Sequence, residues 1–391
     1  MNQTMKERPE TESLSVPTYS PGLEGVIAGE SGLCLVDEGE AGLRYRGYAV
    51  ADLAESSSFE EVAYLLLYGH LPNRQELDEF CGLMDCGRIL SGSVQRCLAP
   101  IPVGVHPMDA LRTGISLLGL ADPEAQDGSH EANLRKSLRL LGQIPLLIAH
   151  MRDAAAGSQP GRTEPKKSFA HHLLQLLTDR EEDEFIEPMA RVLNVSLILY
   201  AEHEFNASTF AARVVASTLT DLHGAITAAV ASLKGPLHGG ANEAVASMMV
   251  EIGRPEKAEA WLRETLAKRQ RIMGFGHRVL KHGDARSAII QRHAEQLSHL
   301  CGEHRWIEIA HTIDRIMQEE KGLYPNLDFY TAVTYLLMGI PPPLYTPLFV
   351  CSRIAGWCAH VIEQQDHNRL IRPRALYTGP APRPYEPLDR R

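Results

Sequence analysis

Apolar residues recur every three to four positions along most of the chain, a spacing that predicts helices nearly throughout. One helix should begin after Ser58, because Ser58 and Glu61 form a capping-box pattern ahead of an apolar face, and Gly69 marks its expected end. The other helical patterns cover residues 129–155, 189–202, 208–233, 255–270, 305–321 and 347–365. The pattern at 208–233 is rich in Ala, Ser, Thr and Val, which favours a core or subunit-interface helix.

Strand-like alternation is scarce and is confined to residues 24–48, where glycines separate short apolar runs. The first twenty residues, the segment 153–168 and the Pro-rich tail after Gly379 have compositions typical of flexible or extended chain. The pattern therefore predicts a helical protein with a small amount of sheet near its N-terminus.

Composition narrows the class of protein. With 391 residues and 44% hydrophobic content, the chain can bury the cores of two domains. It has no uninterrupted apolar run that would span a bilayer, and its first fifteen residues lack the apolar stretch of a secretory signal. Seven scattered cysteines without a CxxC pair favour a reduced, cytoplasmic setting.

The net charge of −10 argues against general binding to nucleic acid or to an anionic membrane. An anionic ligand would need a local basic pocket, and residues 268–286 hold six Lys and Arg side chains against one acid, Asp284. Most such charge runs form a solvated surface, so charge alone leaves both interpretations open.

Four segments place polar residues in apolar helices or glycine-bearing turns: 201–209, 234–242, 272–280 and 323–331. His238 precedes a Gly-Gly pair, and His277 follows a Gly-Phe-Gly turn, so a ligand could approach either imidazole closely. A single histidine of this kind is more often structural than catalytic. Asp328 lies between Leu327 and Phe329, which suits a general base, but a helix N-cap explains an aspartate there equally well.

Other kinds of site fit less well. His203 and Glu204 begin a zinc-protease motif, but position 207 is Ala where its second histidine would be. The chain has no Gly-Lys dipeptide of a P-loop and no GxSxG elbow of a serine hydrolase. His238, His277 and Asp328 lie 39 and 51 residues apart, which matches no short metal-ligand spacing, so we expect no metal.

The segments EHEFNASTF, GPLHGGANEAV, MGFGHRV and YPNLDFY, in that order, resemble the signature blocks of citrate synthases. LRYRGY, HPMDALRTG, LFVCSRIAGWCAH and IRPRALYTGP extend the resemblance over nearly the whole chain from about Gly22. The resemblance implies a nearly all-α homodimer with a large domain (21–238 and 341–391) and a small domain (239–340) that close over the substrates. Residues 1–20 would be a flexible N-terminal segment.

The resemblance also implies an activity, the condensation of an acyl-CoA with oxaloacetate. Asp328 would remove a proton from the carbon beside the thioester. His238 would donate a hydrogen bond to the thioester oxygen, and His277 would donate one to the oxaloacetate ketone. Hydrolysis of the CoA thioester would then release the product. The CoA thioester is thus a co-substrate, and no permanently bound cofactor is implied.

By the same resemblance, substrate carboxylates would be bound by arginines, whose planar fork suits bidentate pairing. The implied substrate contacts are His203, Arg286, Arg353, Arg372 from the partner subunit and, from the methylcitrate-type branch, Arg74. The implied CoA-binding turn consists of Arg271, Ile272, Met273, Gly274 and Phe275, with Lys281 nearby. One departure is Ala285, where the family usually has proline; its loss is expected to loosen the turn before Arg286.

Within the family, 2-methylcitrate synthase, which uses propionyl-CoA, is the alternative. The EHEF block, Thr-Ala after PNLDFY and the tail PYEPLDRR favour that branch, whereas LKGPLHGGANEAV and MGFGHRVLK are also typical of bacterial citrate synthases. One methylene gives only about 1–3 kcal/mol of discrimination, so one enzyme could accept both acyl groups. A non-catalytic helical dimer is a remote alternative, against which the intact His238, His277 and Asp328 count.

Overall fold

The computed structural model describes residues 19–37, 42–102, 104–156, 168–178, 180, 183–276 and 284–391. The chain divides into two compact units. The first contains the two chain ends, up to Glu30 and from Arg372, and its regular elements in the described residues are two short 3-10 turns, η1 (Pro21–Leu23) and η3 (Leu388–Arg390). The second, Ser31–Ile371, contains all the α-helices and strands that the structure describes.

The second unit begins with a small antiparallel sheet in the order β1-β2-β3, formed by β1 (Cys34–Val36), β2 (Leu43–Tyr45) and β3 (Tyr48–Ala49). Cys34 pairs with Tyr45 and Tyr45 pairs with Tyr48. The buried Tyr45 hydroxyl lies 2.9 Å from the carbonyl oxygen of Glu202, so it binds the end of a helix that carries site residues. The predicted N-terminal sheet is confirmed.

The rest of this unit is helical, which confirms the all-α class. Sixteen α-helices occur in the described residues: α1 (Val50–Ser56), α2 (Phe59–Tyr68), α3 (Arg74–Cys86), α4 (Gly92–Leu98), α5 (Pro107–Ala121), α6 (His130–Ala156), α7 (Phe169–Thr178), α8 (Ile186–Tyr200), α9 (Ala207–Ala216), α10 (Leu222–Leu233), α11 (Ala241–Ile252), α12 (Pro255–Ala267), α13 (Ala285–Cys301), α14 (Arg305–Lys321), α15 (Leu327–Met338) and α16 (Tyr345–Asp366). No described helix is both long and apolar enough to cross a bilayer.

Local signals located several helices well. The capping box of Ser58 and Glu61 is present, and Gly69 ends α2 in the left-handed conformation. The pattern at 305–321 coincides with α14. The single helix predicted at 208–233 is wrong, because it divides into α9 and α10. Leu219 adopts a φ of 63°, which a helix does not allow, and the Asp221 side chain caps a new helix by accepting from the backbone N–H of Gly224.

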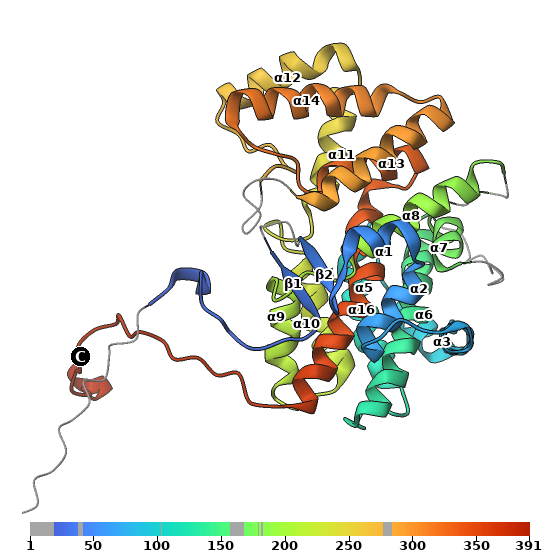
Figure 1. Ribbon diagram of the computed structural model, residues 1–391. Helices are drawn as coiled ribbons and strands as arrows, with labels where there is room; N and C mark the ends of the chain where they lie inside the picture. The colour runs from blue at the N-terminus through green and yellow to red at the C-terminus, as the bar shows by residue number, and fades with distance from the viewer. Residues whose placement is uncertain are drawn as a thin grey trace, which may run out of the picture. The chain divides into compact units, whose positions relative to one another are not determined.

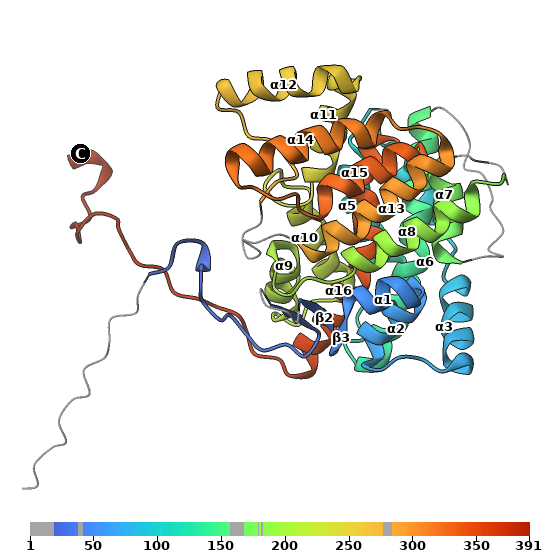
Figure 2. The ribbon, with the colours of Figure 1, turned by 45° about the horizontal axis from the view of Figure 1, so that its top comes forward.

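The long helix α16 is buried along nearly its whole length and contacts α2, α5, α6, α8, α9 and α10. Figures 1 and 2 show it among these helices. α12 packs against α14, as Figure 1 shows. α11, α13 and α14 pack against α15, which is labelled in Figure 2. The helices α11 to α15 join the helices around α16 through contacts of α13 with α8 and of α11 with α16. The predicted domain boundaries, between residues 238 and 239 and between residues 340 and 341, remain predictions.

Candidate active site

His238 lies in the tight turn between α10 and α11. The turn is closed by hydrogen bonds from the N–H of His238 to the Gly235 carbonyl and from the N–H of Gly239 to the Leu233 carbonyl, both 2.9 Å. A Cβ at Gly239 would come within 2.6 Å of that Leu233 oxygen, so only glycine fits there. The close backbone approach therefore explains why glycine follows the histidine.

The proton of His238 is located by its partners. Nε2 lies 3.2 Å from the backbone nitrogen of Ser208, in the first turn of α9. An N–H group only donates, so Nε2 must accept and Nδ1 must carry the proton. Burial, and then the charge of Arg353, lowers the His238 pKa to about 4. His238 is therefore a neutral imidazole at pH 7, with Nδ1–H as its donor.

Asp328 is in the first turn of α15, but it does not cap the helix. The cap is Asn326, whose side-chain oxygen accepts from the backbone N–H of Asp328 at 3.1 Å. The carboxylate of Asp328 is thereby left for another role. Its Oδ1 accepts a 2.6 Å hydrogen bond from the hydroxyl of Tyr200, the last residue of α8.

Burial raises the pKa of Asp328 to about 6, although the Tyr200 hydrogen bond and the charge of Arg286 oppose the shift. The carboxylate is thus mostly ionised at pH 7 and is more basic than an exposed aspartate. A neutral imidazole donor and a carboxylate of raised basicity are the pair that proton removal beside a carbonyl requires.

The candidate CoA-binding turn is joined to the segment before Asp328. Phe275 and Pro325 form an antiparallel bridge, and the N–H of Asn326 donates to the Gly274 carbonyl at 2.9 Å. The Asn326 side chain also donates to the Gly276 carbonyl at 3.1 Å. This pairing places Gly276, the residue before His277, beside the start of α15. His277 and Lys281 lie outside the described residues.

Within that turn, Arg271 is exposed, Ile272 and Phe275 are buried, and Met273 is half-buried. Gly274 has a φ of +85°, and a Cβ there would lie 2.8 Å from the Val245 side chain. Both facts require glycine at this position. The buried side chains leave Arg271 and the backbone as the groups that this turn can present to a ligand.

Two of the predicted arginines, Arg353 and Arg286, lie close to Asp328. Arg353, on α16, is buried, donates from Nε to the Tyr200 carbonyl at 2.6 Å and lies over the Phe349 ring at 4.8 Å. The charge of Arg353 lowers the pKa of both His238 and Asp328. His238, Asp328, Arg353 and Tyr200 therefore form one site.

Arg286, also buried, begins α13 beside Ala285. Its Nε and Nη2 pair with both carboxylate oxygens of Asp284, at 3.0 and 2.8 Å, and Nη1 donates to the Leu199 carbonyl at 3.4 Å. Burial alone lowers the Arg286 pKa, but the Asp284 carboxylate more than offsets it and raises the value overall. Asp284 also caps the helix through the N–H of Arg286, so the turn without proline is held by side-chain contacts.

The remaining predicted residues are dispersed. His203 is half-buried in the segment between α8 and α9, and its carbonyl oxygen lies 3.4 Å from Nδ2 of Asn206. Arg74 is exposed in the first turn of α3, and in the described part of the chain it makes no hydrogen bond or ion pair with the other candidates. Arg372 is exposed and belongs to the unit formed by the chain ends.

A buried charged network behind Arg353 was not predicted. Glu202 Oε1 accepts from His360 Nε2 at 2.8 Å, and His360 Nδ1 in turn accepts from Arg213 at 3.0 Å. A Cβ at Gly356 would overlap the Glu202 carboxylate, so glycine allows α16 to approach it. Burial lowers the pKa of Arg353, and the negative charge of Glu202 raises it, which helps to keep that arginine charged. Glu202 is thus an electrostatic partner of the site.

Sequence reasoning also missed Tyr200 and Ser208, although both flank the EHEFN residues of the first signature block. Their roles depend on partners 128 and 30 residues away, Asp328 and His238. Within the described ranges, no group of three or more His, Cys, Asp or Glu side chains could hold a metal ion.

The chain is similar to known proteins over nearly its whole length. Residues 22–374 match the family model described as "Citrate synthase, C-terminal domain". Citrate synthase 2 of Bacillus subtilis is 46% identical over 96% of this chain and 100% of its own length. The 2-methylcitrate synthase of Shewanella oneidensis is 43% identical over 95% of this chain and 97% of its own.

Among solved structures, citrate synthase of Thermoplasma acidophilum, in a ternary complex with carboxymethyl coenzyme A and oxaloacetate, superposes with a TM-score of 0.88. It is 34% identical, and the match covers 96% of this chain and 100% of that one. Citrate synthase of Thermotoga maritima gives a TM-score of 0.83 at 37% identity, over 95% and 98% of the two chains. The motifs, the helical fold and these matches agree, and the chain belongs to the citrate synthase family.

Proposed function

We propose that this protein condenses acetyl-CoA with oxaloacetate and hydrolyses the thioester, giving citrate and free CoA. One observation carries the proposal. A carboxylate of raised basicity, Asp328, and a histidine fixed as a neutral donor, His238, lie in one site with the buried Arg353. Relatives that are 41–46% identical and bear the names citrate synthase or 2-methylcitrate synthase support it.

In the proposed reaction, Asp328 takes a proton from the methyl carbon of acetyl-CoA while Nδ1–H of His238 donates to the thioester oxygen. The donor is needed because the charge that develops on that oxygen would otherwise make proton removal too costly. The resulting enol carbon attacks the ketone carbon of oxaloacetate, and His277 supplies a proton to the ketone oxygen. Water then cleaves the thioester, so that one citrate and one CoA thiol form for each acetyl-CoA, oxaloacetate and water consumed.

Arg353, Arg286 and the partner's copy of Arg372 would bind the carboxylates of oxaloacetate, with His203 as a further contact. Arg286 already pairs with Asp284 through Nε and Nη2, and Nη1 donates one N–H to the Leu199 carbonyl, so the second N–H of Nη1 is the group that it can turn to a substrate. The turn 271–275, with Lys281, would bind CoA, and Arg74 is the remaining candidate contact. The CoA thioester is a co-substrate that dissociates after each turnover.

We further propose a homodimer with composite active sites and a cytoplasmic location. A C-terminal segment that begins at Arg372, after the long helix α16, is suited to reach a second subunit. A non-catalytic helical dimer would need neither the raised basicity of Asp328 nor the fixed tautomer of His238.

The second candidate function is 2-methylcitrate synthesis from propionyl-CoA, which is favoured by the EHEF block and by the 43% identical 2-methylcitrate synthase. A rate comparison with oxaloacetate saturating separates the two. We expect kcat/KM for acetyl-CoA to exceed that for propionyl-CoA by about tenfold, the lower limit of discrimination by one methylene. A higher kcat/KM for propionyl-CoA would assign the second function instead.

A further inference from the structure

We propose that Tyr200 is a positioning residue for the reaction, holding the Asp328 carboxylate in its ionised, correctly oriented form and linking it to Arg353. The inference rests on the proposed function. It adds a residue that the motif resemblance does not assign.

The geometry is specific to this one residue. Its hydroxyl donates to Asp328 Oδ1 at 2.6 Å, and its carbonyl oxygen accepts from Arg353 Nε at 2.6 Å. A single buried residue at the end of α8 thus contacts the base on α15 and the substrate arginine on α16. A shift of Tyr200 would displace both groups together.

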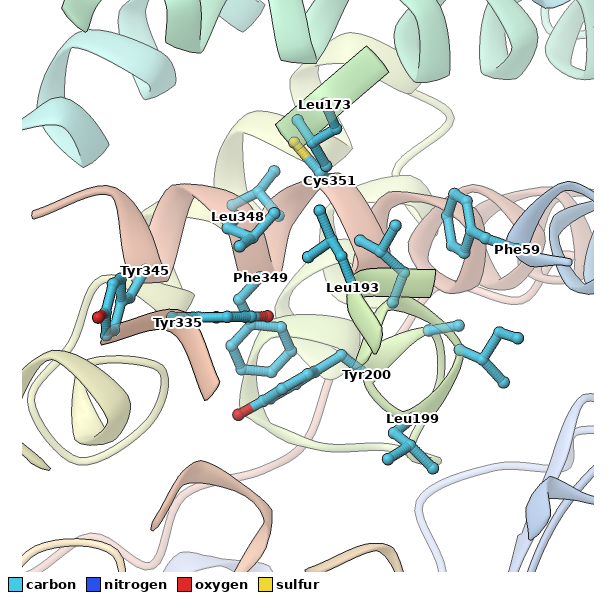
Figure 3. Packing of buried hydrophobic residues seen from close by; sticks show 14 of the residues in the cluster. Phe59, Leu173, Leu193, Leu199, Tyr200, Tyr335, Tyr345, Leu348, Phe349 and Cys351 are labelled. Atoms are coloured by element: carbon cyan, nitrogen blue, oxygen red, sulfur yellow. The ribbon is translucent and has the colours of Figure 1, made fainter. Parts of the chain in front are cut away.

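The ring of Tyr200 is itself fixed by packing. Its centroid lies 4.3 Å from that of Phe349, and the same Phe349 ring lies beneath the guanidinium of Arg353. Figure 3 shows the Tyr200 and Phe349 rings as neighbours. Buried aromatic pairs of this kind hold a single rotamer. The hydroxyl is therefore held toward Asp328 before any substrate binds.

A donor on Oδ1 has two chemical effects. It leaves Oδ2 to accept the proton from the carbon acid, and it stabilises the carboxylate against the burial that raises the Asp328 pKa. Burial, and then the negative charge of Asp328, raises the pKa of Tyr200 well above its usual value, so the phenol stays protonated and remains a donor. In the described residues it is the one side chain that donates a hydrogen bond to this carboxylate.

Besides Tyr200, the ionisable groups coupled to Asp328 come from three elements: Arg286 and Asp284 at the start of α13, Arg353 on α16 and Tyr335 on α15. The two arginines lower its pKa and Asp284 raises it. These groups remain when the Tyr200 hydroxyl is removed. A change in the Asp328 titration would therefore report the hydroxyl itself.

The test is Tyr200→Phe, which keeps the ring against Phe349 and removes only the hydroxyl. We expect kcat at pH 7 to fall by about two- to tenfold, because the acid limb of the pH profile should move up by about one to two pH units. Most of the lost rate should return at pH 9, where Asp328 is ionised again. The deuterium isotope effect with methyl-deuterated acetyl-CoA should rise, since proton removal becomes slower relative to later steps.

A matched control is Tyr330→Phe, in α15, the helix that carries Asp328. The Tyr330 hydroxyl donates to another carboxylate, Asp314, at 2.7 Å, away from the site. This variant loses the same kind of buried hydrogen bond, and its acid limb and isotope effect should equal those of wild type. If Tyr200→Phe does not fold, 3-fluorotyrosine at position 200 keeps the ring and is a stronger donor, so the limb should move to lower pH.

The inference would be overturned if the acid limb of the pH profile did not move in Tyr200→Phe. This holds whether the rate of the variant is normal or is lowered equally at every pH. The same holds if Tyr330→Phe moves the limb equally. Failure of the proposed function looks different: wild type itself would then form no citrate or 2-methylcitrate, whatever residue 200 is.

Discussion

Nε2 of His238 accepts a hydrogen bond from the backbone N–H of Ser208, with 3.2 Å between the two nitrogens. A backbone group supplies this contact, so the tautomer does not depend on a side chain that titrates. The N-terminus of α9 also carries partial positive charge, which disfavours a protonated imidazole beside it. The fold thereby fixes His238 as the neutral donor that the proposed mechanism requires for the thioester oxygen.

The first prediction follows from this contact. His238→Ala should lower kcat by about 10²–10³-fold, the usual cost of removing one donor to a developing oxyanion. Ser208→Ala keeps the backbone N–H and with it the tautomer, so its kcat should stay within about tenfold of wild type. Steady-state rates of the two purified variants make the comparison, and equal losses would contradict the backbone assignment.

The second prediction concerns pH. The pKa of Asp328 is raised to about 6 and that of His238 is lowered to about 4, so of these two groups only Asp328 should titrate between pH 5 and 7. We expect kcat/KM to fall with slope one as the pH drops through about 6, because protonated Asp328 cannot accept a proton. A limb near 4, or a slope of two, would show that this carboxylate does not control the rate.

The third prediction separates the two substrates. Arg353→Ala should weaken oxaloacetate binding by on the order of 10²-fold, since a buried charge-assisted contact is lost. Binding of acyl-CoA, measured by calorimetry, should change far less. Arg315→Ala, at an exposed arginine paired with Glu319, is the control and should leave both affinities unchanged. Equal losses of both affinities in Arg353→Ala would refute the assignment.

Elements set by local chemistry could be predicted from the sequence. The capping box at Ser58 is formed by residues three positions apart, and α14 coincides with the apolar period of residues 305–321. The break at Leu219 was missed because the small-residue pattern on its two sides continues the helical period. Asp221 was the available signal, since an aspartate before an apolar run is a common N-cap.

The candidate site likewise combines features that local sequence predicts with contacts between distant residues. Motif blocks singled out His238 and Asp328 as candidates, but sequence spacing could not decide whether Asp328 caps a helix. The contact of Asn326 with the N–H of Asp328 decides that question. Tyr200 lies 128 residues from its partner, and Glu202 lies 158 residues from His360. Contacts over such separations depend on how helices pack, which no local pattern encodes.

The fourth prediction tests the composite site. Arg372→Ala and His238→Ala should each be inactive alone, and mixing the subunits should restore activity. In a mixed dimer one site carries both changes and the other neither, so the activity should be at most about half that of wild type. Mass spectrometry verifies subunit exchange. Exchanged dimers without activity would mean that Arg372 serves its own subunit.

The assignment of Asp328 as the base is tested most directly by Asp328→Asn. Replacing the carboxylate should lower kcat by about 10²–10⁴-fold. The binding of oxaloacetate and acyl-CoA should change little. The thermal midpoint at pH 7.5 should not fall: because the folded-state pKa is raised, ionisation of Asp328 costs stability as the pH rises from about 4 to above 6, and Asn removes that cost. A folded Asp328→Asn protein that forms citrate at a near-normal rate would contradict the mechanism.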